Sequence, residues 1–226
     1  YVDHEIVSNI EHDCENRLKR YNGNKTKRVL MPIGGAGAQK EILLSVLKKF
    51  KTEIENGELA VYLNAGEHKD VFDDLKKILT PMFKNVQIHD NWNEMKEFAY
   101  NALESDDIKG IHLFYEKEIF PAVYITNILM RSCDFMVTKP SELSFYPVPK
   151  IFIKRVGGHE EWGAIRSSEV GDGTIECRDI DSVVTAFKLA FGSKDLIEFY
   201  CNNIINNNKI GLYNGAYNVI KIATGR

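Results

Sequence analysis

Short apolar segments alternate with longer amphipathic segments along most of the chain. Apolar runs typical of buried strands occupy residues 29–33, 59–64, 86–89, 110–114, 134–138 and 150–155. Apolar residues recur at helical spacing in residues 39–50, 69–79, 93–103, 119–132 and 160–170, and a short helical turn is expected at 140–146. Further helical stretches close the chain at 183–191, 194–207 and 210–222.

This alternation of strand and helix predicts an α/β fold. A strand, a helix and a second parallel strand form a right-handed crossover, so about six repeats predict a parallel sheet with helices on both faces. We therefore expect a Rossmann-like three-layer domain with about six strands, followed by C-terminal helices. The polar residues 1–28 are expected to form a leader or hinge segment, and residues 29–226 the folded domain.

Composition narrows the class of protein. Of the 226 residues, 44% are hydrophobic, enough for a packed core. The formal net charge of −3 argues against a general nucleic-acid binder, whose surface is basic. The four cysteines are far apart and form no CxxC pair, which indicates reduced thiols and a cytoplasmic protein. No apolar run reaches the roughly 20 residues that span a bilayer, and no signal peptide is visible.

The candidate ligand contacts follow from the expected sheet. In open parallel sheets, ligands bind beyond the carboxyl ends of the strands, near the point where the strand order reverses. Residues that directly follow predicted strands are therefore the candidates. These segments are 34–39, 113–115, 138–142 and 156–161.

A glycine cluster follows the first predicted strand. Its glycines let the backbone turn tightly and approach a ligand, and the free N–H groups of the helix that begins there suit an anion such as phosphate. The spacing matches neither GxGxxG nor a Walker loop, so a close-packed turn between strand and helix explains the cluster equally well. The candidate phosphate contacts are Gly34, Gly35, Ala36, Gly37, Ala38 and Gln39.

Two further segments combine aromatic and polar residues. After the fourth strand, Phe114 or Tyr115 could stack on a flat heterocycle, although the end of a core strand explains Phe114 more simply. After the fifth strand, Pro140 favours the first turn of a helix and holds the preceding residue in extended geometry. Glu142 lies in that turn, where its carboxylate could bind a ribose diol or only complement the helix dipole. The candidate contacts in this turn are Lys139, Ser141 and Glu142.

The segment after the sixth strand crowds polar side chains behind two glycines. His159, Glu160 and Glu161 are adjacent, and adjacent residues cannot easily converge on one metal ion. Hydrogen bonds to sugar hydroxyls are a better use for them, and acids near a helix start are also ordinary structural features. We expect no metal site, because the acidic pair within residues 72–74 belongs to a predicted helix.

The order of these segments resembles the donor half of a GT-B glycosyltransferase. The likeness covers residues 29–226 and is greatest to the nucleotide-sugar-binding domain of bacterial and plastid lipid glycosyltransferases. That group includes the diacylglycerol glycosyltransferases and the enzyme that adds N-acetylglucosamine to the peptidoglycan lipid precursor. The segments that carry the likeness are GGAGAQ (34–39), CDFMVTKPSE (133–142), PVPKIFI (147–153), GGHEEWGA (157–164) and VGDGT (170–174).

The resemblance implies a domain that binds a nucleotide sugar, with a UDP-sugar favoured, for transfer to an unknown lipid or glycan acceptor without a cofactor. It implies that residues 34–39 face the diphosphate and that Phe114 and Tyr115 lie near the uracil. Glu142 would bind the ribose, and residues 159–161 would face the sugar and the phosphates. The family's glycine-containing segment is shortened here to TKPSE, and the asparagine usual after the two acids is absent. A non-catalytic member is therefore an alternative.

A second domain is also implied, because a GT-B enzyme has two and the acceptor side commonly belongs to the first. This chain has room for one, so we expect a separate acceptor domain or partner subunit, no sugar transfer by the chain alone, and membrane association only through the missing half. The alternatives are a nucleotide-sugar-binding or assembly subunit and half of a nucleotide-sugar 2-epimerase. A nicotinamide-dependent oxidoreductase is less favoured, because the glycine spacing is wrong and no clear acid ends the second strand.

Overall fold

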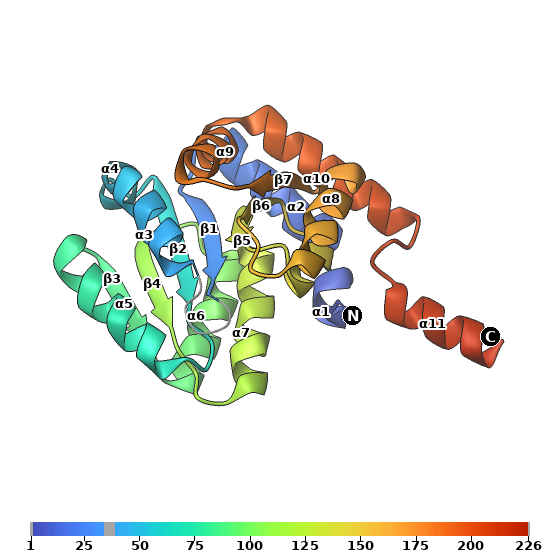
Figure 1. Cartoon of the computed structure of the whole chain (residues 1–226), viewed down its shortest axis with the longest axis horizontal. Coiled ribbons are helices and arrows are strands. Elements are labelled where there is room, and N and C mark those ends of the chain that lie inside the picture. Colours follow the sequence, from blue (N-terminus) through green and yellow to red (C-terminus); the bar gives the residue numbers. More distant parts are fainter. Residues whose placement is uncertain (1, 34–38, 226) are drawn as a thin grey trace.

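The computed structural model describes residues 2–33 and 39–225. Their strands form one parallel sheet with the order β3-β4-β2-β1-β5-β6-β7, which confirms the predicted α/β fold (Figure 1). The strands are β1 (Lys27–Pro32), β2 (Leu59–Asn64), β3 (Val86–His89), β4 (Gly110–Phe114), β5 (Phe135–Thr138), β6 (Lys150–Ile153) and β7 (Gly173–Cys177).

The seventh strand is the one that the hydrophobic pattern did not predict. Strand β7 lies at the edge of the sheet and pairs only with β6 among the described strands. Its sequence GTIEC contains a single aliphatic residue, Ile175, whose side chain is 68% exposed. An edge strand with one covered face needs no continuous apolar run, so its sequence carries a weak signal.

Helices cover both faces of the sheet (Figure 1). The α-helices are α1 (His4–Val7), α2 (Ile10–Asn22), α3 (Lys40–Lys49), α4 (Lys51–Glu55), α5 (Lys69–Met82), α6 (Trp92–Glu104), α7 (Ile119–Ser132), α8 (Glu161–Val170), α9 (Ile180–Gly192), α10 (Lys194–Lys209) and α11 (Gly215–Thr224). Two 3₁₀ turns, η1 (Glu142–Phe145) and η2 (Gly158–Glu160), follow β5 and β6.

The side chains of β1, β2, β4 and β5 alternate between two separate apolar clusters, one on each face. In β1, Val29 and Met31 belong to the cluster that includes residues of α3, α5, α9 and α10, whereas Leu30 belongs to the cluster under α6 and α7. This alternation follows from the two-residue repeat of a strand. The chain leaves β1 and β2 toward the first face, and leaves β4 and β5 toward the second.

The strand order therefore creates one broad crevice. Strands β1 and β5 are neighbours, and so are β2 and β4, yet the helices that follow the two members of each pair lie on opposite faces. Loops that diverge in this way leave space between them at the carboxyl edge of the sheet. Strand β4 lies between β2 and β3, so the crevice extends along the carboxyl ends of β5, β1, β2 and β4.

The N-terminal helix α2 packs onto this domain. Arg17 is buried and donates hydrogen bonds to the carbonyl oxygens of Cys133 (2.8 Å) and Met130 (2.9 Å). Arg20 contacts the buried carboxylate of Asp134 at 2.8 Å. These two arginines tie α2 to the end of α7.

Of the C-terminal helices, α9 and α10 contribute residues to the first apolar cluster. Helix α11 has no buried residue and projects from the rest of the chain (Figure 1).

Candidate functional site

A cavity of about 300 Å³ occupies the crevice at the carboxyl edge of the sheet. Its floor is formed by the ends of β1, β2 and β5, and its walls by the segment after β2, the first half of α7 and the η1 turn. The lining residues are Pro32, Ile33, Asn64, Gly66, Glu67, His68, Ile119, Val123, Thr126, Asn127, Thr138, Lys139, Ser141, Glu142, Leu143 and Tyr146. The cavity lies where the strand order predicts a ligand.

The candidate residues after β5 line this cavity together. Lys139 is half-buried, Ser141 has extended backbone, and Glu142 is the first residue of the η1 turn. The Glu142 side chain is exposed, and its carboxylate has no hydrogen-bond or ion-pair partner among the described residues. It is therefore available to a ligand.

The glycine cluster lies mostly outside the described residues, because Gly34, Gly35, Ala36, Gly37 and Ala38 are not among them. Gln39 is the first described residue after the cluster. It has a left-handed backbone (φ 71°) at the N-terminus of α3, and its side chain does not cap the helix. The chain therefore turns sharply into α3 at this position.

The carboxylate of Glu160 is occupied within the protein. It forms an ion pair with the ammonium group of Lys139 and accepts hydrogen bonds from the backbone N–H groups of Val156 (2.8 Å) and Gly157 (3.2 Å). Burial alone would raise the pKa of Glu160, but the lysine and the two N–H groups outweigh it and hold the pKa below its usual value. In this arrangement Glu160 stabilises the loop after β6 and holds Lys139 at the cavity wall.

His159 and Glu161, the neighbours of Glu160 in the sequence, contact other residues. Glu161 contacts Arg155 at 2.7 Å, and Arg155 also lies 3.4 Å from Glu176. His159 is exposed, and its ring stands over Gly157, where an added Cβ would lie 2.6 Å from the imidazole. Within the described ranges, no group of three His, Cys, Asp or Glu side chains could hold a metal ion.

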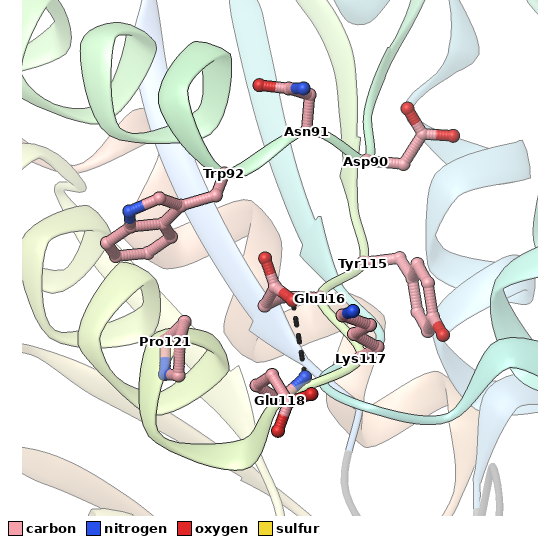
Figure 2. Close-up of a pocket in the computed structure, with 8 residues that line it drawn as sticks. All are labelled: Asp90, Asn91, Trp92, Tyr115, Glu116, Lys117, Glu118 and Pro121. Atoms are coloured by element: carbon pink, nitrogen blue, oxygen red, sulfur yellow. Dashed lines mark hydrogen bonds between the residues drawn. The ribbon is translucent and has the colours of Figure 1, made fainter.

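A second cavity, of about 400 Å³, lies beside the first at the ends of β3 and β4. Figure 2 shows Tyr115 on the opposite side of this cavity from Trp92 and Pro121, with Glu116 between them. Phe114 does not reach it, because its fully buried ring stacks on His89 with the ring centroids 4.5 Å apart. Tyr115 and the candidate residues after β5 therefore line different cavities.

The shortened TKPSE segment packs directly onto α8. A Cβ added at Gly163 would lie 2.4 Å from Ser144 Oγ and 3.0 Å from the carbonyl oxygen of Pro140, so only glycine allows this approach. Ser167 Oγ also donates a hydrogen bond to the carbonyl oxygen of Ser144 at 3.0 Å. Glycine at position 163 thus keeps the η1 turn, and Glu142 with it, against α8.

Three further polar residues line the first cavity. Thr138 lies within the segment 138–142 that was selected from the sequence, whereas Asn64 ends β2 and was not selected, although the same rule applies to it. Asn127 lies within the apolar helix α7, where nothing in the local pattern distinguishes it from a tolerated polar residue.

Comparison with solved structures supports the architecture. The C-terminal CMP-Kdo binding domain of WaaA from Acinetobacter baumannii superposes with a TM-score of 0.53 at 12% sequence identity, covering 88% of this chain and 97% of that domain. At this identity the likeness shows a shared fold. A search of curated proteins finds no significant match.

In the described part of the chain, no helix is both long and apolar enough to cross a membrane.

The comparison with family models places residues 1–224 in the family described as Domain of unknown function (DUF6938), and the chain belongs to this family.

Proposed function

We propose that this chain is the donor-binding domain of a GT-B glycosyltransferase and binds a nucleoside-diphosphate sugar, with a UDP-sugar favoured. The observation that carries the proposal is the cavity at the switch in strand order. There the carboxylate of Glu142, which has no partner among the described residues, lies beside Ser141 and Lys139. The shared fold with a CMP-Kdo binding domain supports it.

In this proposal the donor extends along the carboxyl edge of the sheet. Glu142 accepts hydrogen bonds from the ribose hydroxyl groups, and the segment 34–39, with Gln39 at the start of α3, contacts the diphosphate. His159 and Glu161 lie on the side of β6 and contact the sugar. Backbone N–H groups and a helix N-terminus would then stabilise the leaving diphosphate electrostatically.

The acceptor and the general base belong, in this proposal, to a domain or subunit outside this chain. The ion pairs of Glu160 with Lys139 and of Glu161 with Arg155 leave neither acid free to act as a base in the described structure. The same two ion pairs favour a second candidate function, a nucleotide-sugar-binding subunit with no activity of its own. Sugar transfer can be measured as nucleotide release with lipid and glycan acceptors. If the chain alone transferred sugar, both the donor domain that needs a separate acceptor domain and the inactive binding subunit would be excluded.

Isothermal titration tests the proposed ligand. UDP should bind, and NAD and S-adenosylmethionine should not; GDP and CMP test the choice of base and the number of phosphates. Tight NAD binding without binding of any nucleoside phosphate would overturn the proposal.

The Glu142→Gln variant tests the proposed ribose contact. Losing a charge-assisted hydrogen bond should weaken UDP binding about tenfold. Inorganic diphosphate, which has no ribose, should bind as before. Because the Glu142 side chain is exposed and has no partner in the described ranges, the melting temperature should not change.

A further inference from the structure

We propose that the base of the donor nucleotide binds in the cavity between β1, β2, β5 and α7, with the hydroxyl group of Thr138 and the amide group of Asn127 as its hydrogen-bond partners. This inference rests on the proposed function and places the base away from Tyr115. It follows from the polar groups of the cavity, its apolar walls and the position of Glu142.

Thr138 carries a hydroxyl group at the wall of the cavity. It is the last residue of β5, is only 2% exposed, and lines the cavity. No described residue forms a hydrogen bond with its hydroxyl group. Its hydroxyl oxygen is not one of the fully buried polar atoms that lack a partner, so it is open to the cavity, where a polar group of a ligand can reach it.

Asn127 presents a second incompletely paired group on the facing wall. It belongs to α7, is 7% exposed, and donates one long hydrogen bond of 3.4 Å to the carboxylate of Asp3. Its side-chain oxygen accepts no hydrogen bond from the described residues. An amide offers a donor and an acceptor side by side, which is the pattern that the edge of a nucleobase requires.

Two other polar side chains of the cavity, those of Asn64 and Thr126, already form hydrogen bonds within the protein. Asn64 donates to Thr126 Oγ1 at 2.7 Å and accepts from the backbone N–H of Gly66 at 2.9 Å. These bonds tie β2 to α7 and fix the cavity wall. The Thr138 hydroxyl group and the Asn127 side-chain oxygen, which have no partner in the part of the chain that the structure describes, therefore differ from the structural polar groups around them.

The rest of the lining fits a flat heterocycle joined to a ribose. Apolar side chains of Ile33, Ile119, Val123 and Leu143 face the cavity, and Glu142 stands at its wall. The volume of about 300 Å³ lies at the lower end of the range for ligand pockets, which suits one nucleoside and not a dinucleotide. A ribose held by Glu142 brings its base into this cavity.

The second cavity fits a base less well. Tyr115 packs against Phe72, with the ring centroids 5.1 Å apart, so one face of its ring is already covered. The other polar lining there is mostly carboxylate, and Glu116 accepts a hydrogen bond from the backbone N–H of Glu118 at 3.2 Å. Glu142 does not line this cavity.

The Thr138→Val variant, which removes the hydroxyl group at nearly constant volume, provides the test. Titration with UMP, CMP and UDP should show affinity lowered about two- to tenfold, the effect of losing one neutral hydrogen bond. Inorganic diphosphate should bind as it does to the parent protein. Thr138→Ser, which keeps the hydroxyl group, should bind the nucleotides like the parent, and Tyr115→Ala should change nucleotide affinity little.

The outcomes separate this inference from the proposed function. If Tyr115→Ala weakens nucleotide binding and Thr138→Val does not, the base lies in the second cavity and only this inference fails. If Thr138→Val weakens diphosphate and nucleotides equally, the hydroxyl group serves a phosphate and the inference also fails. If the parent protein binds none of the nucleotides, the proposed function itself fails.

A measurement on the parent protein covers the case in which the variants do not fold. Nuclear Overhauser effects should connect the base protons of bound UMP with the methyl groups of Val123 and Leu143. Contacts from the base to the ring of Tyr115 instead would overturn the inference.

Discussion

The ammonium group of Lys139 contacts the carboxylate of Glu160 across the loops that follow β5 and β6. Glu160 was predicted from sequence as a ligand contact, and in the structure its two oxygens hold Lys139 and two backbone N–H groups. The pair joins the wall of the cavity to the loop that precedes α8. The shape of the cavity therefore depends on a contact between residues 21 positions apart.

Glu160→Gln should lower the free energy of unfolding by about 1 to 3 kcal/mol, because it leaves a half-buried lysine without its counter-charge. Denaturant unfolding at neutral pH measures this change. The matched control is Glu161→Gln. The Glu161 side chain is 44% exposed, so solvent screens its ion pair with Arg155, and its loss should change the free energy of unfolding less than the loss of Glu160. Equal losses in the two variants would contradict a special role for Glu160.

A buried histidine pair should make the protein less stable in acid. His89 Nε2 lies 3.1 Å from His112 Nδ1, and His112 Nε2 lies 3.2 Å from the carbonyl oxygen of Lys109. Since only an N–H can bond to that carbonyl, neutral His112 donates there and accepts from His89. Burial lowers the pKa of His89 to about 4, and burial together with the proximity of His89 lowers that of His112 to about 3.

The direction of the pH effect follows from these values. Below the ordinary histidine pKa of about 6.5, the unfolded chain binds protons that the folded chain does not. Stability should therefore be full above pH 6.5 and fall toward pH 4, by at most roughly 1.4 kcal/mol per pH unit for each histidine. Urea unfolding at pH 7 and pH 5 measures the slope. His89→Leu combined with His112→Leu should flatten it, whereas His159→Gln, at an exposed position, should leave it unchanged.

Gly163→Ala should destabilise the protein by about 1 to 3 kcal/mol, the usual effect of adding a methyl group to a packed site. The new Cβ would lie 2.4 Å from Ser144 Oγ, which is itself held by a hydrogen bond of 2.5 Å to the carbonyl oxygen of Ser141. Displacing this turn also moves Glu142, so nucleotide affinity should fall as well. Gly158→Ala is the control, because apart from its chain neighbours no described residue has an atom within 4 Å of the added Cβ. A normal melting temperature for Gly163→Ala would show that the turn can move freely.

The hydrophobic pattern by itself determined most of the elements. The run at 59–64 matches β2 residue for residue, and the amphipathic stretch at 119–132 matches α7. These elements are predictable because burial on a sheet or beneath a helix imposes a repeat that is visible within a few residues. The same pattern did not predict β7, since an edge strand needs few apolar residues, nor the position of β4 between β2 and β3, because strand pairing depends on contacts distant in sequence.

The same distinction applies to the cavity. The rule of strand ends led directly to Lys139, Ser141 and Glu142, because a position just after a strand is a local property. Only the tertiary structure decided that Glu160 pairs with Lys139, that Phe114 is covered by His89, and that Tyr115 belongs to a second cavity. It also brought Thr138 on β5 and Asn127 on α7 to the same cavity. Which buried polar group lacks a partner depends on every residue packed around it, and that information lies in no single segment of the sequence.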